Sequence, residues 1–437
     1  MLGYRDEQRS LTRQQKEAIG LLSIGTFLEY FDLMLYIHMA VMLNDLFFPK
    51  TDPKVASLLS AAAFCSTYAL RPFAAFILGW IGDNIGRKST VIITTLIMAA
   101  SCFVMANLST YAEKGIIVSW IMIICRMSQG ISSMGEIIGA ELYVTETTKP
   151  PAQYVCIGII NIASIIGSIA ALIFGIISTT YLLNWRYAFW GGTVIALVGF
   201  LARTRLREST EFVDAKRRIK NTLENFGIDT EKLPYKEYIE EKVNMKTALA
   251  YFLILPSGSA CFYLIYVHCA NLFKTNFDYS AAAIMENSLY ISIVHLITAS
   301  VLTSLVLKFH PLKILKVQRI IFLFVMPIGV YFLNNIAAPF DLFKVQSLFV
   351  IISIAVGTAS PIVYKSFPVF KRFTYSTVIY ALAKIFITVI TSFGMVYLIN
   401  ILGNYGILLI MMPVGIAFYW SVSHFESVEK LRGNYQH

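Results

Sequence analysis

Residues 79–88 read GWIGDNIGRK and lie at the junction of two long apolar runs, residues 55–80 and 88–108. Three glycines in ten residues permit a tight turn and a close approach of neighbouring helices. Asp83 belongs to the residue types that cap helix N-termini, so we expect it to cap the helix that follows. The stretch ends in two basic residues, which are typical of a membrane surface. It therefore predicts two membrane helices joined by a short surface turn.

The whole chain has the composition of a membrane protein. Of its 437 residues, 57% are hydrophobic and 14% are charged, and the mean hydropathy is +0.66. Soluble domains contain about 45–50% apolar and ~25% charged residues. Because a membrane helix needs about 20 mostly apolar residues, the apolar runs predict an all-α polytopic protein with twelve transmembrane helices. The predicted spans are 18–42, 55–80, 88–108, 115–142, 154–178, 186–206, 247–271, 284–307, 317–336, 343–365, 376–400 and 404–424.

One long polar segment divides the predicted spans into two groups of six. Residues 207–246 hold nine Lys or Arg and nine Asp or Glu, a pattern typical of a solvated linker. We therefore expect five parts in the chain. They are an N-terminal segment 1–17, a six-helix bundle 18–206, the linker 207–246, a second six-helix bundle 247–424 and a tail 425–437.

Basic residues are distributed unequally over the two sides of this topology. If residue 1 is cytoplasmic, the cytoplasmic segments carry 27 of the 36 Lys and Arg, the opposite side six and the spans three. The positive-inside rule then places both termini in the cytoplasm. The net charge of +10 follows from this topology, so no nucleic-acid partner is needed. Residues 1–17 are too polar for a cleavable signal.

Several other classes of protein lack support in the sequence. The six Cys form no CxxC pair, so we expect buried thiols, no disulfide and no metal site. No GxxxxGK[ST] phosphate loop occurs, which argues against an ATP-driven pump. The sequence shows no nucleophile-base pair of the kind that would indicate an enzyme. We expect no cofactor.

Charged residues inside the predicted spans are the best candidates for function. Each costs about 2.5–3.5 kcal/mol at mid-bilayer, so these residues must face one another or water. They mark an ion or substrate route, or else static buried pairs that fix helix register. The six are Glu29, Asp32, Arg71, Arg126, Glu136 and Lys384.

The first span carries two of these carboxylates on one stripe. Gly25, Glu29, Asp32 and Tyr36 follow an i, i+4, i+7, i+11 pattern and so share one face of a helix. Two carboxylates one turn apart in a low dielectric repel each other, so one is expected to hold a proton at neutral pH. This arrangement is what a proton-coupled carrier requires.

Polar residues of other spans complete the expected cavity. Arg126, Gln129 and Ser133 share a face of the fourth span, with Glu136 near its edge. Lys384 lies too far from either membrane surface to reach it easily and needs a carboxylate or an anionic substrate. The alternative for the uncharged residues is helix packing. The uncharged candidates are Asn161, Tyr263, His268, Tyr290 and Tyr380.

The loop at residues 79–88 resembles the G-x-x-x-D-x-x-G-R-[RK] signature of the major facilitator superfamily. Other segments are similar to motifs of its metabolite:proton symporter branch, which holds proline/betaine, α-ketoglutarate, citrate and shikimate carriers. Those segments are Glu29-Tyr30-Phe31-Asp32-Leu33 with Tyr36, Leu70-Arg71-Pro72-Phe73, Arg126-Met127-Ser128-Gln129-Gly130 with Gly135-Glu136, Trp185-Arg186-Tyr187-Ala188-Phe189, and Lys365-Ser366-Phe367-Pro368.

This resemblance implies two six-helix bundles around a mid-membrane cavity that works by alternating access. It also implies symport of a solute with protons. The residues that it implies for binding the solute and the protons are Glu29, Asp32, Arg71, Arg126 and Glu136. The positions that match the family's cytoplasmic gate are Gly79, Asp83, Gly86, Arg87, Lys88 and Glu146.

The second half departs more from the family pattern than the first. The second copy of the loop signature is expected at residues 307–315, which read LKFHPLKIL and contain neither the Asp nor the Gly-Arg. Lys365 replaces a family glutamate, and Lys384 stands where a small or apolar residue is expected.

The leading hypothesis is a monomeric, proton-coupled symporter in a bacterial inner membrane that imports a small polar solute. A zwitterion such as proline or betaine is favoured, because the first-half motifs are most like that subgroup. One alternative is a di- or tricarboxylate, which Arg71 and Lys384 from opposite bundles would clamp. Another is a transport-dead solute sensor on the same fold. The predicted partners are thus a solute, protons and the lipid bilayer.

Overall fold

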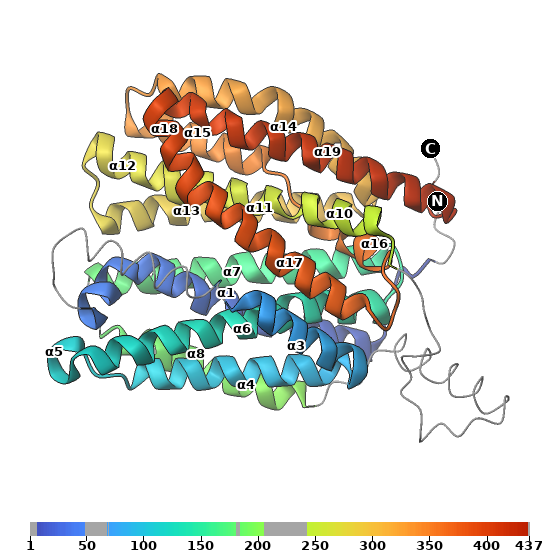
Figure 1. Ribbon diagram of the computed structural model, residues 1–437, viewed down its shortest axis with the longest axis horizontal. Helices are drawn as coiled ribbons and strands as arrows, with labels where there is room; N and C mark the ends of the chain where they lie inside the picture. The colour runs from blue at the N-terminus through green and yellow to red at the C-terminus, as the bar shows by residue number, and fades with distance from the viewer. Residues whose placement is uncertain (1–6, 49–67, 69, 181–183, 205–242, 436–437) are drawn as a thin grey trace.

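The computed structural model describes residues 7–48, 68, 70–180, 184–204 and 243–435, which fold almost entirely into helices (Figure 1). Within these residues the one β-bridge pairs Gln8 with Pro151. Most of the predicted linker 207–246 and the first part of the predicted span 55–80 lie outside the described residues. The prediction of an all-α protein is confirmed.

The first half of the chain forms long helices connected by short turns. Gly86 precedes α4 with a φ of 145°, a conformation that favours glycine, as expected for a tight turn. The helices are α1 (Arg13–Phe47), α3 (Arg71–Asn84), α4 (Arg87–Ala106), α5 (Tyr111–Lys114), α6 (Ile116–Thr147), α7 (Ala152–Thr180) and α8 (Arg186–Arg203).

The second half is more interrupted. Two π-helical segments, η1 (Tyr263–His268) and η3 (Ile390–Met395), and two short 3-10 segments, η2 (Gly357–Ala359) and η4 (Gly403–Ile407), break its helices. The α-helices are α10 (Met245–Ile254), α11 (Pro256–Phe262), α12 (Cys269–Phe277), α13 (Ala281–Leu305), α14 (Pro311–Asn334), α15 (Pro339–Ile352), α16 (Ser360–Tyr364), α17 (Arg372–Val389), α18 (Val396–Leu402) and α19 (Leu408–Leu431).

Within the described ranges, nine helical runs are long and apolar enough to cross a membrane. One of them, Arg372–Leu431, reverses direction after α18 (Figure 1) and so contains two predicted spans. The count of twelve stays a prediction, because α8 and the described part of α3 are not among the nine.

The predicted span 343–365 corresponds to the apolar run Pro339–Tyr364, but this run is not one continuous helix. α15 ends at Ile352 and the chain is non-helical until Gly357, where φ is +47°. The segment after the last predicted span begins as helix, because α19 continues to Leu431.

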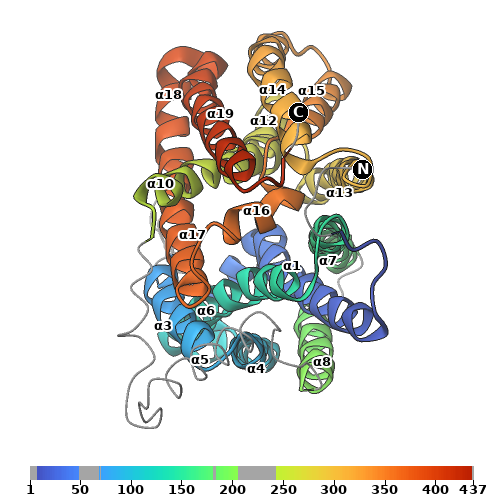
Figure 2. The ribbon, with the colours of Figure 1, turned by 90° about the vertical axis from the view of Figure 1, so that its right-hand side faces the viewer.

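The two halves lie side by side and touch through α3 with α17 and through α7 with α13 (Figures 1 and 2). The glycines of the 79–88 loop make the first contact possible. A Cβ at Gly79 would lie 2.6 Å from Thr374 Cα, and one at Gly82 would lie 2.7 Å from the Phe373 ring. Any larger residue would push α3 away from α17.

We expect Gly79→Leu to destabilise the α3 contact with α17, because overpacking a tight interface costs about 1–3 kcal/mol. A lower thermal midpoint of the purified protein would report the effect. Gly20→Leu on α1 is the control, since a Cβ there would meet no atom within 4 Å. Equal midpoints for the two variants would contradict this account of the contact.

Candidate functional site

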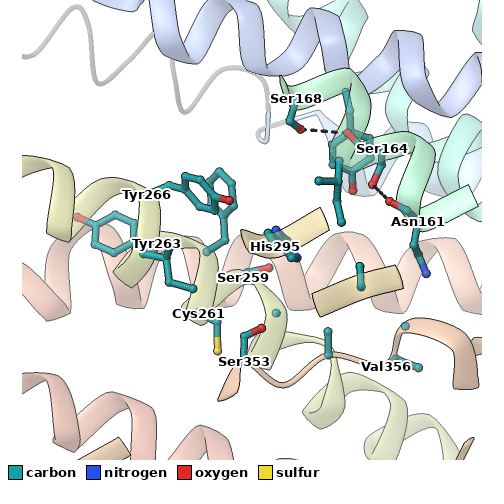
Figure 3. A pocket seen from close by; sticks show the side chains of 18 of the residues that line it. Asn161, Ser164, Ser168, Ser259, Cys261, Tyr263, Tyr266, His295, Ser353 and Val356 are labelled. Carbon is teal, nitrogen blue, oxygen red and sulfur yellow. Dashed lines mark hydrogen bonds between the residues drawn. The ribbon is translucent and has the colours of Figure 1, made fainter. Parts of the chain in front are cut away.

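A cavity of about 420 Å³ lies between the two halves. Side chains of α7 face those of η1 and α13 across it (Figure 3). Among the residues that Figure 3 labels are Asn161, Ser164, Ser168, Tyr263, Tyr266 and His295. The cavity is thus lined by both halves, as a site for alternating access requires.

Irregular backbone surrounds the cavity. Residues 353–358, between α15 and α16, line it, and so do residues of η1 and η3. Non-helical backbone at membrane depth is tolerated where it lines a cavity, and π segments are frequent at functional sites. The three interruptions of the second half therefore support a functional role for this cavity.

Three cationic side chains line the cavity. Arg71 lies on α3 and Arg126 on α6, whereas Lys384 comes from α17 in the other half. The positive charges of Arg71 and Lys384 are close enough to repel each other. Among the described lining residues none is Asp or Glu. The described part of the cavity wall therefore carries positive charge.

Lys384 is held by neutral partners. Its Nζ donates to Ser259 Oγ at 2.7 Å and lies 5.2 Å from the centre of the Tyr380 ring. We expected a carboxylate partner or an anionic substrate, and no ion pair to Lys384 exists in the described part of the chain.

Arg126 is fixed by a buried cluster at the edge of the cavity. Its Nη1 donates to Gln129 Oε1 at 2.7 Å, and its guanidinium lies 4.0 Å from the centre of the Tyr36 ring. Asp32 is close enough for its charge to interact with that of Arg126. Cys102 Sγ on α4 donates to Asp32 Oδ1 at 3.2 Å.

Neither carboxylate of α1 is among the described residues that line the cavity. Asp32 contacts α4, and Glu29 lines a small separate pocket together with Thr95 and Ser132. Glu29 is nevertheless close enough to interact electrostatically with Tyr380 of the cavity wall. Helical periodicity fixes a common face of α1 and does not identify the neighbour of that face.

The remaining predicted cavity residues divide into two groups. Asn161, Tyr263 and Tyr380 line the cavity. His268 is buried elsewhere, and Tyr290 is half exposed on α13, where its hydroxyl donates to Glu286 at 3.1 Å. Those two placements correct the sequence prediction. The backbone of Glu136 lies in α6 and that of Arg87 in α4, but both side chains lie outside the described structure.

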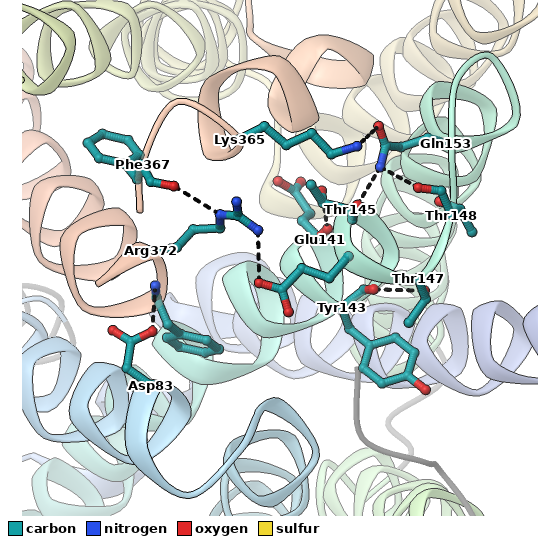
Figure 4. A network of polar contacts seen from close by, with 12 residues as sticks. Asp83, Glu141, Tyr143, Thr145, Thr147, Thr148, Gln153, Lys365, Phe367 and Arg372 are labelled. Atoms are coloured by element: carbon teal, nitrogen blue, oxygen red, sulfur yellow. Dashed lines mark hydrogen bonds and ion pairs between the residues drawn. The ribbon is translucent and has the colours of Figure 1, made fainter. Parts of the chain in front are cut away.

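The two halves contact each other at one end of the molecule, called here the closed end, where α3 and α6 of the first half meet α16 and α17 of the second (Figures 2 and 4). Asp83 accepts hydrogen bonds from the backbone N–H of Phe373 at 3.1 Å and of Thr374 at 2.8 Å. Asp83 thus caps α17 of the other half, whereas we expected it to cap the next helix. A carboxylate suits this place because the N-terminus of a helix has unsatisfied N–H groups and a partial positive charge.

Further contacts at the closed end join the halves (Figure 4). Arg372 on α17 forms an ion pair with Glu146 on α6 at 3.1 Å, and both side chains are at most 5% exposed. Lys365 donates to Gln153 on α7 at 3.2 Å. Lys88, a predicted gate residue, donates instead to the Thr204 carbonyl within the first half, at 2.9 Å.

The second-half loop at 307–315 is built differently. His310 precedes α14 and accepts a hydrogen bond from the Leu312 N–H through Nδ1 at 3.3 Å. Its ring packs against Tyr154 and Tyr435. Burial, helped by Lys313, lowers the pKa of His310 to about 4, so the ring is neutral at neutral pH. A neutral cap stands here in place of the family's Asp.

Sequence reasoning missed several polar residues of the site. His38 lines the cavity, and Arg372 and Glu141 join the halves at the closed end. A lone His or Tyr in an apolar helix has no distinctive pattern. The partners of Arg372 and Glu141 lie more than 200 residues away, at sequence separations of 226 and 223.

Comparison with known proteins agrees with this geometry. The family model described as Major Facilitator Superfamily matches residues 22–394. A proline/betaine transporter of Salmonella typhimurium is 26% identical over 272 residues, which are 61% of this chain and 54% of the relative. An inner membrane metabolite transport protein of Escherichia coli is 30% identical over 230 residues, 50% of this chain and 52% of the relative. The chain spans about half the length of these curated relatives.

Solved structures share the fold. The proton:xylose symporter XylE, bound to 6-bromo-6-deoxy-D-glucose, has a TM-score of 0.71 at 15% identity, and 94% of each chain is covered. The human organic anion transporter MFSD10 has a TM-score of 0.63 at 14% identity, covering 95% of this chain and 100% of that one. At these identities the likeness establishes the fold alone.

We expect Glu146→Gln to loosen the closed end, because removing one partner of a buried ion pair costs about 3–5 kcal/mol. Alkylation of Ser376→Cys, at a position that is 0% exposed, would report entry of water, and the rate should rise in the variant. The exchanged pair Glu146→Arg with Arg372→Glu should restore slow labelling.

Asp341→Asn provides the matched control, since it breaks an ion pair of the same 3.1 Å length that is exposed and contributes at most about 1 kcal/mol. If Glu146→Gln labels no faster than this control, the ion pair does not hold the closed end.

Proposed function

On the premise that this chain belongs to the Major Facilitator Superfamily, and is thus a membrane transporter and not an enzyme, we propose that it is a proton-coupled symporter of a small organic anion. One observation carries the choice of substrate. Arg71 and Lys384, from opposite halves, line one cavity in which the described lining residues include no acidic side chain. A solute with one or two carboxylates, such as α-ketoglutarate, complements that charge.

The geometry of the two cations suits a carboxylate. The planar guanidinium of Arg71 binds a carboxylate through two parallel hydrogen bonds, and the Lys384 ammonium acts as a compact point charge. A dianion balances both charges and relieves their mutual repulsion. A net neutral solute leaves that repulsion in place. The charges of Arg71 and Lys384 therefore favour the di- or tricarboxylate alternative over the zwitterion that the sequence motifs suggested.

A zwitterion such as proline or betaine remains a second candidate, because two observations favour it. Curated relatives are named proline/betaine transporters. The cavity is also lined by aromatic rings, which attract ammonium groups through cation–π contacts. These rings are Tyr30, Tyr68, Phe262, Tyr263, Tyr266 and Tyr380.

The proposed cycle moves the two halves about the cavity. Basic residues gather at the closed end, among them Lys88, Lys365 and Arg372, so we place this end in the cytoplasm of a bacterial inner membrane. The described conformation is then shut toward the cytoplasm. A substrate that binds Arg71 and Lys384 together draws the halves toward each other, which shifts the balance between the two states.

Proton coupling is proposed to act through the Asp32 and Arg126 pair. Arg126 lines the cavity, while Asp32 interacts with it from the interior of the first half. A substrate anion near Arg126 competes with Asp32 for the positive charge. Protonation of Asp32 therefore frees Arg126 for the substrate, which links the binding of the two.

We expect Lys384→Ala to weaken α-ketoglutarate binding roughly ten- to hundred-fold, because a hydrogen bond to a charged group is worth about 1.5–3 kcal/mol. Betaine binding should change much less. Competition against labelled α-ketoglutarate in proteoliposomes measures both effects. Lys344→Ala is the control, since Lys344 is exposed and paired with Asp341. An equal loss for both solutes would contradict the proposed clamp.

We expect Asp32→Asn or Glu29→Gln to abolish accumulation driven by a proton gradient, while exchange of bound solute stays partly intact. A protonophore should collapse accumulation by the parent protein. Wild-type accumulation in both variants would refute coupling through α1. Uptake that is independent of the proton gradient would indicate a facilitator. Binding of a solute without its transport would indicate a sensor.

A further inference from the structure

A third buried carboxylate, besides Asp83 and Glu146, lies at the interface between the halves. Glu141 on α6 is 7% exposed at the closed end (Figure 4). Tyr364 on α16 donates its hydroxyl hydrogen to Glu141 Oε2 at 2.7 Å. The bond joins residues 223 positions apart, one in each half of the chain. It exists only while the closed end is shut.

The titratable groups that interact with Glu141 in the described structure are phenols. Tyr364 donates to it, and Tyr251 on α10 packs edge-on against the Tyr364 ring with centroids 6.0 Å apart. Tyr30 on α1 is also close enough to interact with Glu141. Phenols supply hydrogen bonds and no positive charge.

The cations of the closed end are engaged elsewhere. Arg372 pairs with Glu146, and Lys365 donates to Gln153. As far as the chain is described, no ion pair reaches the Glu141 carboxylate. The two carboxylates therefore differ in their surroundings. Glu146 has a cation opposite it, whereas Glu141 has phenols.

This environment favours a neutral Glu141. An ionised carboxylate buried without a cation is costly, whereas a protonated one with hydrogen bonds is tolerated. Ser360, whose hydroxyl donates to the Gly357 carbonyl at 2.8 Å, is a further uncharged neighbour of the carboxylate.

Opening of the closed end would favour the ionised form of Glu141 over the neutral form. Separation of α16 from α6 removes the Tyr364 hydrogen bond and admits water to Glu141, and water stabilises the ionised form. We infer that Glu141 is a proton-binding site of the transport cycle, occupied while the closed end is shut and emptied when that end opens. This inference rests on the proposed symport, to which it adds the place of proton release.

Infrared spectroscopy of the protein in vesicles tests whether Glu141 holds a proton, and this measurement needs no solute. At neutral pH the wild type should show the C=O band of a protonated carboxylic acid, which shifts in D2O. Glu141→Gln should lose the part of this band that Glu141 contributes, whereas any part from a protonated carboxyl group of α1 should remain. Glu286→Gln should keep it, because Glu286 is exposed on α13. Glu146→Gln, which opens the closed end, should weaken it.

A second variant keeps the test valid should Glu141→Gln misfold. Tyr364→Phe removes the donor but leaves the carboxyl group, so the band should persist at a changed frequency. Identical carboxyl bands in the wild type, Glu141→Gln and Tyr364→Phe across acidic and neutral pH would overturn the inference.

Transport separates this inference from the proposed function. With α-ketoglutarate as the probe, Glu141→Gln should retain exchange and lose accumulation driven by a proton gradient. Wild-type accumulation by Glu141→Gln overturns the inference and leaves the symport proposal intact. Absence of proton-driven uptake by the wild type, with the band present, overturns the symport proposal alone.

Discussion

Charge inside a bilayer must be matched by the protein or by water, and this constraint organises the whole structure. A charged side chain at mid-membrane costs several kcal/mol unless it has a partner. Asp32 and Arg126 meet within the first half, and Glu146 and Arg372 meet across the halves. Arg71, Arg126 and Lys384 line the cavity, where Lys384 has neutral partners. Arg126 thus belongs both to a buried charge pair and to the cavity wall.

The same constraint explains how the two halves recognise each other. The N-terminus of α17 has N–H groups that need acceptors where the two halves bury them. Asp83 of α3 supplies them, and Gly79 and Gly82 let α3 approach closely enough to do so. Contacts of this polar kind can be exchanged for water when the closed end opens. The signature loop is therefore a reversible seal between halves rather than a turn within one half.

Sequence reasoning located most of the spans and three cationic residues of the cavity wall, Arg71, Arg126 and Lys384. Composition and run length suffice for spans, and a charge in an apolar run stands out against its surroundings. The partner of Asp83 was not predictable, because it lies 290 residues away. The π segments leave no signal in hydrophobic periodicity, so the inward position of Tyr266 in η1 was missed. Glu141 was missed because its role depends on Tyr364 in the other half.

The central claim is that the positive cavity selects organic anions. The most direct measurement is the thermal midpoint of the purified protein against a panel of solutes, since a ligand that binds the folded state raises that midpoint. Dicarboxylates such as α-ketoglutarate should raise it at low millimolar concentration, and proline and betaine should raise it less. A rise with proline or betaine alone, and none with any carboxylate anion, would contradict the claim.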